Sequence, residues 1–165
     1  MAGKQEEVRI RRVIACFSPG YGARPEPVAR LAREMEAELL GLFIEDVELL
    51  RFASLPFARE IGSASASMRA LSVSELERQL RAQARELERE ITAILGAGSW
   101  SLRVERSSPL RAIEAALAQV LEPALVLPPG VRLAGELQRV RKKELTREAL
   151  KKWLAAGRPV VVLPE

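Results

Sequence analysis

Histidine is absent from the 165-residue chain, and cysteine occurs once, at Cys16. A single cysteine excludes an internal disulfide, and one cysteine without histidine makes a zinc site unfavourable. The missing histidine also excludes nucleophilic catalysis of the Ser-His-Asp and Cys-His kinds. Because Cys16 falls inside an apolar run, we expect a buried thiol that packs in the core; a redox sensor is the alternative. These absences agree with the expectation of a protein that is not an enzyme and holds neither a metal nor another cofactor.

Long hydrophobic stretches are missing as well. A membrane-spanning helix needs about 20 predominantly apolar residues, whereas even the longest runs of large apolar residues after a turn, such as residues 42–44 and 160–163, are short. The first seven residues are polar and acidic, unlike a secretory signal. Hydrophobic residues make up 48% and charged residues 29% of the chain, which is typical of a folded domain with one core. We expect a cytoplasmic protein without a membrane partner.

Charge is unevenly distributed along the chain, whose formal net charge is +4. Residues 132–152 contain eight cations and three anions, so the rest of the chain is nearly neutral. Such a basic stretch is able to contact the phosphates of nucleic acid. Its cations do not form one narrow helical stripe, however, and Trp153 is the only aromatic residue there that could stack on a base. We expect a solvated helix face, with nucleic-acid binding as the alternative.

Hydrophobic periodicity predicts alternating strands and helices. Short apolar runs bounded by turn residues predict buried strands at residues 13–17, 39–44, 124–127 and 160–163. A segment of alternating apolar and polar residues predicts a half-exposed strand at residues 100–106. Apolar residues spaced three and four apart predict helices at about residues 25–39, 72–95, 109–120 and 134–156. Ser108 is the expected N-cap of the third helix, and Gly157 is expected to end the last one.

The order of these elements predicts one α/β domain over residues 1–165, a doubly wound five-stranded parallel sheet of flavodoxin- or Rossmann-like type. Residues 47–70 do not fit the alternation and form an irregular or helical insert. This insert is a lid, a partner site or a cover for the sheet edge, and the sequence leaves these alternatives open.

Several segments resemble the universal stress protein superfamily. They are RRVIA at residues 11–15, LRVE at 102–105 after a long helix, SSPLRAI at 107–113 and RPVVVLP at 158–164. The segments LLGLFIED (39–46), LLR (49–51) and LPFARE (55–60) resemble one bacterial branch of that superfamily. The resemblance covers about residues 8–164. It implies the strand order 3-2-1-4-5 and a homodimer made by pairing last strands.

The resemblance also implies where contacts lie. The dimer interface would be the last strand, with prolines limiting its edge; the alternative is an edge covered by a helix of the same chain. Its residues are Val160, Val161, Val162 and Leu163. A ligand would lie where the strand order reverses, between the first and fourth strands. The candidate lining residues are Phe17, Ser18, Gly20, Glu45, Asp46, Pro128, Pro129 and Gly130.

The chain departs from the family's ATP-binding pattern at three places. ATP-binding members carry an acid where this chain has Phe17, and Gly-x2-Gly-x9-Gly-Ser/Thr where it has only Gly130 and Gly135 with four residues between them. Pro128 and Pro129 remove two amide donors where a phosphate would need them. The adjacent Glu45 and Asp46 either hold Mg²⁺ or form a solvated strand end, of which we favour the second.

The sequence therefore suggests a universal stress protein-like, non-catalytic, dimeric domain with a regulatory or protein-binding role and a lost or remodelled nucleotide site. An unidentified protein partner would go with that role. One alternative is a stress protein that binds ATP or another adenine nucleotide and hydrolyses it slowly at most. The other is a basic accessory protein that binds nucleic acid.

Overall fold

The computed structural model describes residues 9–18, 24–45, 73–129 and 137–164, and the predicted insert at residues 47–70 lies entirely outside them. In chain order the elements are β1 (Arg12–Phe17), α1 (Pro25–Glu34), β2 (Glu38–Ile44), α4 (Val73–Leu95), β3 (Trp100–Glu105), α5 (Pro109–Gln119), β4 (Ala124–Leu127), β5 (Gln138–Arg141), the 3₁₀ turn η1 (Lys142–Glu144), α6 (Arg147–Ala156) and β6 (Val160–Leu163). The alternation of strands and helices confirms the α/β class.

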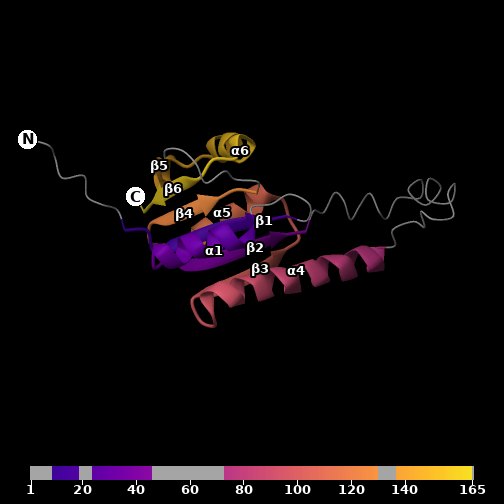
Figure 1. Ribbon diagram of the computed structural model, residues 1–165. Helices are drawn as coiled ribbons and strands as arrows, with labels where there is room; N and C mark the ends of the chain where they lie inside the picture. The colour runs from indigo at the N-terminus through magenta and orange to yellow at the C-terminus, as the bar shows by residue number, and fades with distance from the viewer. Residues whose placement is uncertain (1–8, 19–23, 46–72, 130–136, 165) are drawn as a thin grey trace, which may run out of the picture.

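The strands form one sheet of order β3-β2-β1-β4-β6-β5 (Figure 1). Strands β3, β2, β1 and β4 run parallel to one another, whereas β6 pairs antiparallel with β4 and parallel with β5. The predicted order 3-2-1-4 is correct for the first four strands. The predicted five-stranded, wholly parallel sheet is wrong, because the described residues form six strands in a mixed sheet.

The error lies in the basic stretch, where the sequence predicted one helix at about residues 134–156. Instead, β5 spans Gln138–Arg141 and α6 begins only at Arg147. Three of the four β5 residues are exposed and Val140 is half-buried, which suits an outer strand with few apolar contacts. The unit β5-α6-β6 is a parallel strand–helix–strand unit that runs opposite to the first four strands.

Strand β6 lies inside the sheet, between β4 and β5. The three valines Val160, Val161 and Val162 are buried. A strand that is apolar on both faces is stable at an interior position, because helices cover both of its faces there. The prediction that Val160–Leu163 forms an exposed edge is therefore wrong, and the homodimer expected through this strand has no free backbone edge to use.

Helices cover both faces of the sheet in three layers (Figure 1). On β1, Val13, Ala15 and Phe17 face a core shared with α1 and α4. The alternate residues, Ile14 and Cys16, face a second core shared with α5 and α6. This alternation follows from the two-residue period of a strand.

Local signals fix most helix ends. The Ser108 Oγ accepts a hydrogen bond of 3.3 Å from the Arg111 amide at the start of α5, as predicted. Gly157 ends α6 in the left-handed conformation with φ of 62°, also as predicted. Helix α1 ends before the predicted residue 39, because Glu36 adopts a φ of 53° and β2 begins at Glu38.

Candidate functional site at the carboxyl ends of the strands

Strands β1 and β4 are neighbours with parallel register, from Arg12 opposite Ala124 to Ala15 opposite Leu127. Because β2 lies on the other side of β1, the strand order reverses between β1 and β4, which is where an α/β sheet forms its ligand crevice. Of the predicted lining residues, the structure describes Phe17, Ser18, Glu45, Pro128 and Pro129. Gly20, Asp46 and Gly130 lie outside the described residues.

The described part of this crevice offers few polar groups. Phe17 is buried in the core below α1 and α4, and Pro128 is fully buried at the end of β4. Pro129 and Ser18 are half-buried. Since proline has no amide hydrogen, neither residue that follows β4 can donate a backbone hydrogen bond to a phosphate. Phe17 is a core residue and not an exposed ligand contact.

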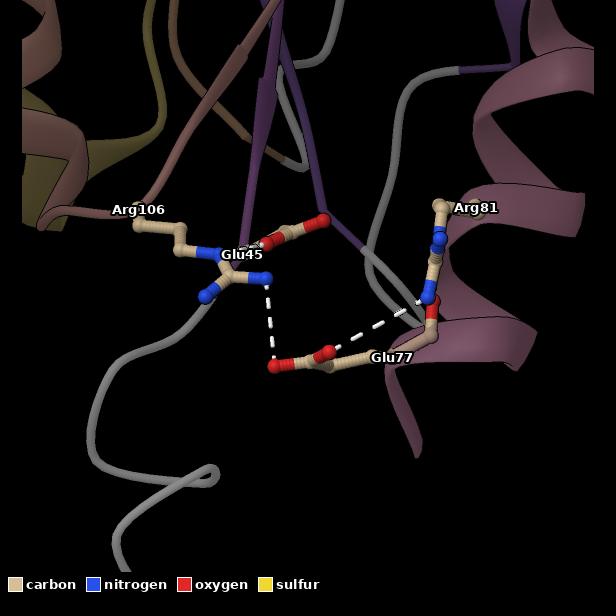
Figure 2. Close-up of polar contacts among 4 residues, drawn as sticks. All are labelled: Glu45, Glu77, Arg81 and Arg106. Carbon is tan, nitrogen blue, oxygen red and sulfur yellow. Dashed lines mark hydrogen bonds and ion pairs between the residues drawn. The ribbon is translucent and has the colours of Figure 1, made fainter. Parts of the chain in front are cut away.

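Glu45 follows β2 and is not the solvated carboxylate that the sequence suggested. Only 5% of its side chain is exposed. Arg106, which follows β3, donates a hydrogen bond of 2.8 Å from Nε to the Glu45 Oε2 (Figure 2). The Glu45 amide also donates to the Glu105 carbonyl at 2.8 Å, which extends the pairing of β2 and β3 by one residue. The ends of two neighbouring parallel strands thus bring the pair together.

Helix α4 joins the same network through Glu77 near its start. The Arg106 guanidinium lies 3.2 Å from Glu77 Oε1, so one arginine bridges two carboxylates (Figure 2). Arg81, one turn further along α4, donates from Nε to the Glu77 carbonyl at 3.4 Å. The network connects the sheet to the first turns of α4, a contact between residues far apart in sequence.

The electrostatics of the network favour a charged arginine. The hydrogen bond to Glu45 and the negative charges of Glu45 and Glu77 raise the pKa of Arg106 above its ordinary value. Because the Glu45 carboxylate already has a cationic partner, it is poorly suited to bind Mg²⁺. Among the described residues, no group of three acidic, cysteine or histidine side chains is arranged to hold a metal ion.

Cys16 lies in β1 without exposed surface. Burial raises the pKa of its thiol from the usual 9.0 to about 12, so the thiol stays protonated at neutral pH. The prediction that Cys16 packs in the core is confirmed.

The basic stretch of the sequence is divided between an edge strand and a helix. Arg139 and Arg141 are exposed on β5, and two exposed lysines follow on α6. Lys142 is not a free surface cation, because its Nζ donates to the Val120 carbonyl at 3.0 Å and so joins η1 to the end of α5.

Sequence reasoning missed Arg106 as the partner of Glu45, and Glu77 as the second carboxylate that Arg106 contacts. A signal for Arg106 was present, since Glu45 directly follows one predicted strand and Arg106 is the last residue of the strand predicted to be its parallel neighbour. No comparable signal identified Glu77, whose place beside the sheet depends on how α4 packs.

The geometry defines a three-layered α/β domain with a mixed sheet. No family model and no curated protein matches the chain. Within the described residues, no helix is both long and apolar enough to cross a bilayer. Membership of the universal stress protein superfamily remains a prediction from the sequence motifs.

Proposed function

We propose that this chain is a non-catalytic domain of the universal stress protein type, with a regulatory or protein-binding role in the cytoplasm and no nucleotide site of the ATP-binding kind. The observation that carries the proposal is the pair of prolines after β4, one buried and one half-buried. A phosphate bound at this strand end would need backbone amide donors, and these two residues have none.

Glu45 also supports the proposal; it follows β2, which lies on the side of β1 away from β4. Its carboxylate is buried and bound to Arg106, so it lacks the freedom to coordinate a Mg²⁺ ion that would accompany ATP. A role without catalysis agrees with the lack of histidine and with the protonated, buried thiol of Cys16.

Calorimetric titration of the purified chain with ATP and Mg²⁺ tests the proposal. We expect no saturable heat with ATP, ADP or AMP. Micromolar binding of any of them would contradict the proposal and favour the alternative, a nucleotide-binding stress protein with slow hydrolysis. A Pro128→Ala/Pro129→Ala variant serves as the comparison, because it restores two amide donors at the same strand end.

A second candidate function, binding of nucleic acid, is favoured by the position of Arg139 and Arg141. These exposed residues are two apart on a strand, so they point to the same side at a spacing of roughly 7 Å. A pair of cations on one side of an open sheet edge is able to contact successive phosphates.

Salt-dependent retention on DNA distinguishes the two candidates. If the second is correct, retention falls steeply with salt and is lost in Arg139→Glu/Arg141→Glu. The matched control is Arg78→Glu/Arg85→Glu, which makes the same change of charge at exposed positions of α4. Under our leading proposal, neither the wild type nor the control shows salt-sensitive retention.

A further inference from the structure

The sheet has two outer strands within the described residues, and they differ in charge pattern. Strand β3 pairs only with β2, and β5 pairs only with β6. An outer strand leaves a row of backbone donors and acceptors unpaired, which is a template for pairing with another chain.

Alternate residues of β3 present their backbone groups to this free side. The carbonyls of Ser99 and Glu105 accept hydrogen bonds from β2, at 3.1 and 2.8 Å. Because N–H and C=O groups alternate in direction along a strand, those of Trp100, Leu102 and Val104 point away from β2. Val104 is also one of the most exposed large hydrophobic residues described, with half of its surface accessible.

Helix α4 leaves room beside β3. A groove of about 600 Å³ separates the two elements, with Ala84 and Glu88 of α4 on one side and Leu102 and Val104 of β3 on the other. A further strand paired with β3 would lie roughly 4.8 Å from it, at the mouth of this groove.

The charges of β3 favour a second copy of the same strand in one register. When two copies pair antiparallel about a two-fold axis at Val104, Arg103 of each copy stands opposite Glu105 of the other. An axis at Arg103 would instead place two arginines directly opposite each other, and an axis at Leu102 would place Arg103 opposite Ser101. Opposite charges in facing positions stabilise a strand pair, and like charges destabilise it.

The side chains of Arg103 and Glu105 are both able to form an ion pair. No described residue pairs with the Glu105 carboxylate. Arg103 is exposed and makes one side-chain contact with the described residues, a 3.2 Å hydrogen bond to the Gln119 Oε1, which leaves other N–H groups of its guanidinium unused.

Strand β5, the other outer strand, has charges that disfavour pairing with a second copy of itself. Pairing β5 with its own copy about Val140 places Arg139 opposite Arg141, and an axis at either arginine places that residue opposite itself. Each of these three registers brings cations together, which disfavours self-pairing at this edge.

We infer that the chain forms a homodimer by antiparallel pairing of β3 with β3 of a second copy, centred on Val104 and held in register by two Arg103–Glu105 ion pairs. The six described strands of each copy then continue into one sheet of twelve. The dimer holds whether or not the crevice binds a nucleotide, so it goes beyond the proposed function.

Sedimentation equilibrium of charge variants tests this interface. The wild type should have twice the 18.2 kDa mass of the chain. Arg103→Glu and Glu105→Arg should each weaken the dimer by roughly ten- to a hundredfold, since each places like charges opposite one another twice. The double variant Arg103→Glu/Glu105→Arg should restore the dimer, because the ion pairs re-form with their charges exchanged. Arg139→Glu makes the same change on β5 and should leave the dimer unchanged.

Oxidative cross-linking of single cysteine variants tests the register. Facing residues in a hydrogen-bonded antiparallel pair have Cα atoms about 5.5 Å apart, within the range for a disulfide. Val104→Cys should therefore cross-link, whereas Leu102→Cys and Arg103→Cys should not. Cys16 will not interfere, because it is buried and protonated.

Three results would overturn the inference. They are a monomeric wild type at all accessible concentrations, a dimer that is insensitive to the β3 charges, and a double variant that stays dissociated while its circular dichroism shows a folded chain. If a single charge variant fails to fold, the cross-linking result decides: absence of a Val104→Cys disulfide, or a stronger one at position 102 or 103, rejects the register.

Discussion

Arg106 and Glu45 follow two neighbouring parallel strands, and the arginine Nε lies 2.8 Å from the glutamate Oε2. The contact depends on strand register, since Glu105 stands opposite Ile44 and the next residue of each strand is a member of the pair. Because Glu45 is buried while Arg106 is more than half exposed, the arginine supplies the charge that keeps a carboxylate inside the fold.

Loss of Arg106 should therefore destabilise the fold more than loss of the Glu45 charge. Glu45→Gln should lower the free energy of unfolding by about 1–2 kcal/mol, since a neutral amide accepts a weaker bond from the guanidinium. Arg106→Met should cost more, because it leaves a buried carboxylate without a partner. In the double variant most of that additional loss should disappear, as measured by urea denaturation. Equal effects of the two single variants, adding without recovery, would contradict the pairing.

Thr146 distinguishes the observed short α6 from the single long helix that the sequence predicted. Its Oγ1 accepts a 3.1 Å hydrogen bond from the Ala149 amide and caps the helix start. Thr146→Ala should therefore lower the free energy of unfolding by about 1 kcal/mol. In an uninterrupted helix the same substitution would be stabilising, because alanine has the higher helix propensity. The sign of the change in urea denaturation is the readout.

Glu36 occupies a backbone conformation that favours glycine. The Glu36 amide donates to the Arg33 carbonyl and the Ala37 amide to the Ala32 carbonyl, the hydrogen bonds of a Schellman motif at the end of α1. Because φ of Glu36 is 53°, Glu36→Gly should raise the free energy of unfolding by about 1 kcal/mol. Glu34→Gly, two residues earlier at the last residue of α1, should lower it by about 0.5 kcal/mol. Thermal denaturation of both variants should shift in opposite directions.

Cys16 should contribute a pH dependence of stability in alkaline solution. The unfolded thiol loses its proton above its usual pKa of 9.0, whereas burial keeps the folded thiol protonated up to about 12. Between these values the unfolded state binds fewer protons, so the free energy of unfolding falls as pH rises, by up to about 1.4 kcal/mol per pH unit. Below the lower value Cys16 contributes no slope.

Cys16→Ala provides the comparison for that slope. The variant loses a constant amount of stability for its smaller side chain, and its unfolding free energy should fall less steeply at alkaline pH than that of the wild type. Parallel pH profiles for the two proteins would contradict the buried, protonated thiol.

Signals within a few residues were sufficient to predict much of the fold. Ser108 before Pro109 and Gly157 after the last apolar helix positions are local features, and the structure has helix ends at both. The strand at Ala124–Leu127 was predicted with its observed bounds, since a fully buried strand is a continuous apolar run.

Strand β5 could not be predicted in the same way. Gln138–Arg141 contains a single apolar residue, so neither a period of two nor an apolar run marks it as a strand. Strand β5 is held in the sheet by pairing with β6, which pairs with β4 on its other side. This pairing joins β5 to a strand 19 or more residues later in the chain, so nothing within β5 itself indicates it. The continuous run of valines in β6 was consistent with an interior strand. The edge position was predicted instead, because the resembled family has its last strand at the edge of the sheet.

The candidate site was predictable in position and not in chemistry. The adjacency of β1 and β4 was implied by the resemblance to the universal stress protein superfamily, and the structure contains it. That Glu45 would be buried and paired depended on Arg106, a residue 61 positions away. The exposure of a charged side chain depends on the residues that pack against it, and these tertiary contacts cannot be predicted from the neighbouring sequence.

Native mass spectrometry of the chain purified without added nucleotide tests the central claim most directly. We predict a mass that is a whole multiple of the polypeptide mass of 18.2 kDa, with no bound small molecule. A species that carries the additional mass of an adenine nucleotide would contradict the account.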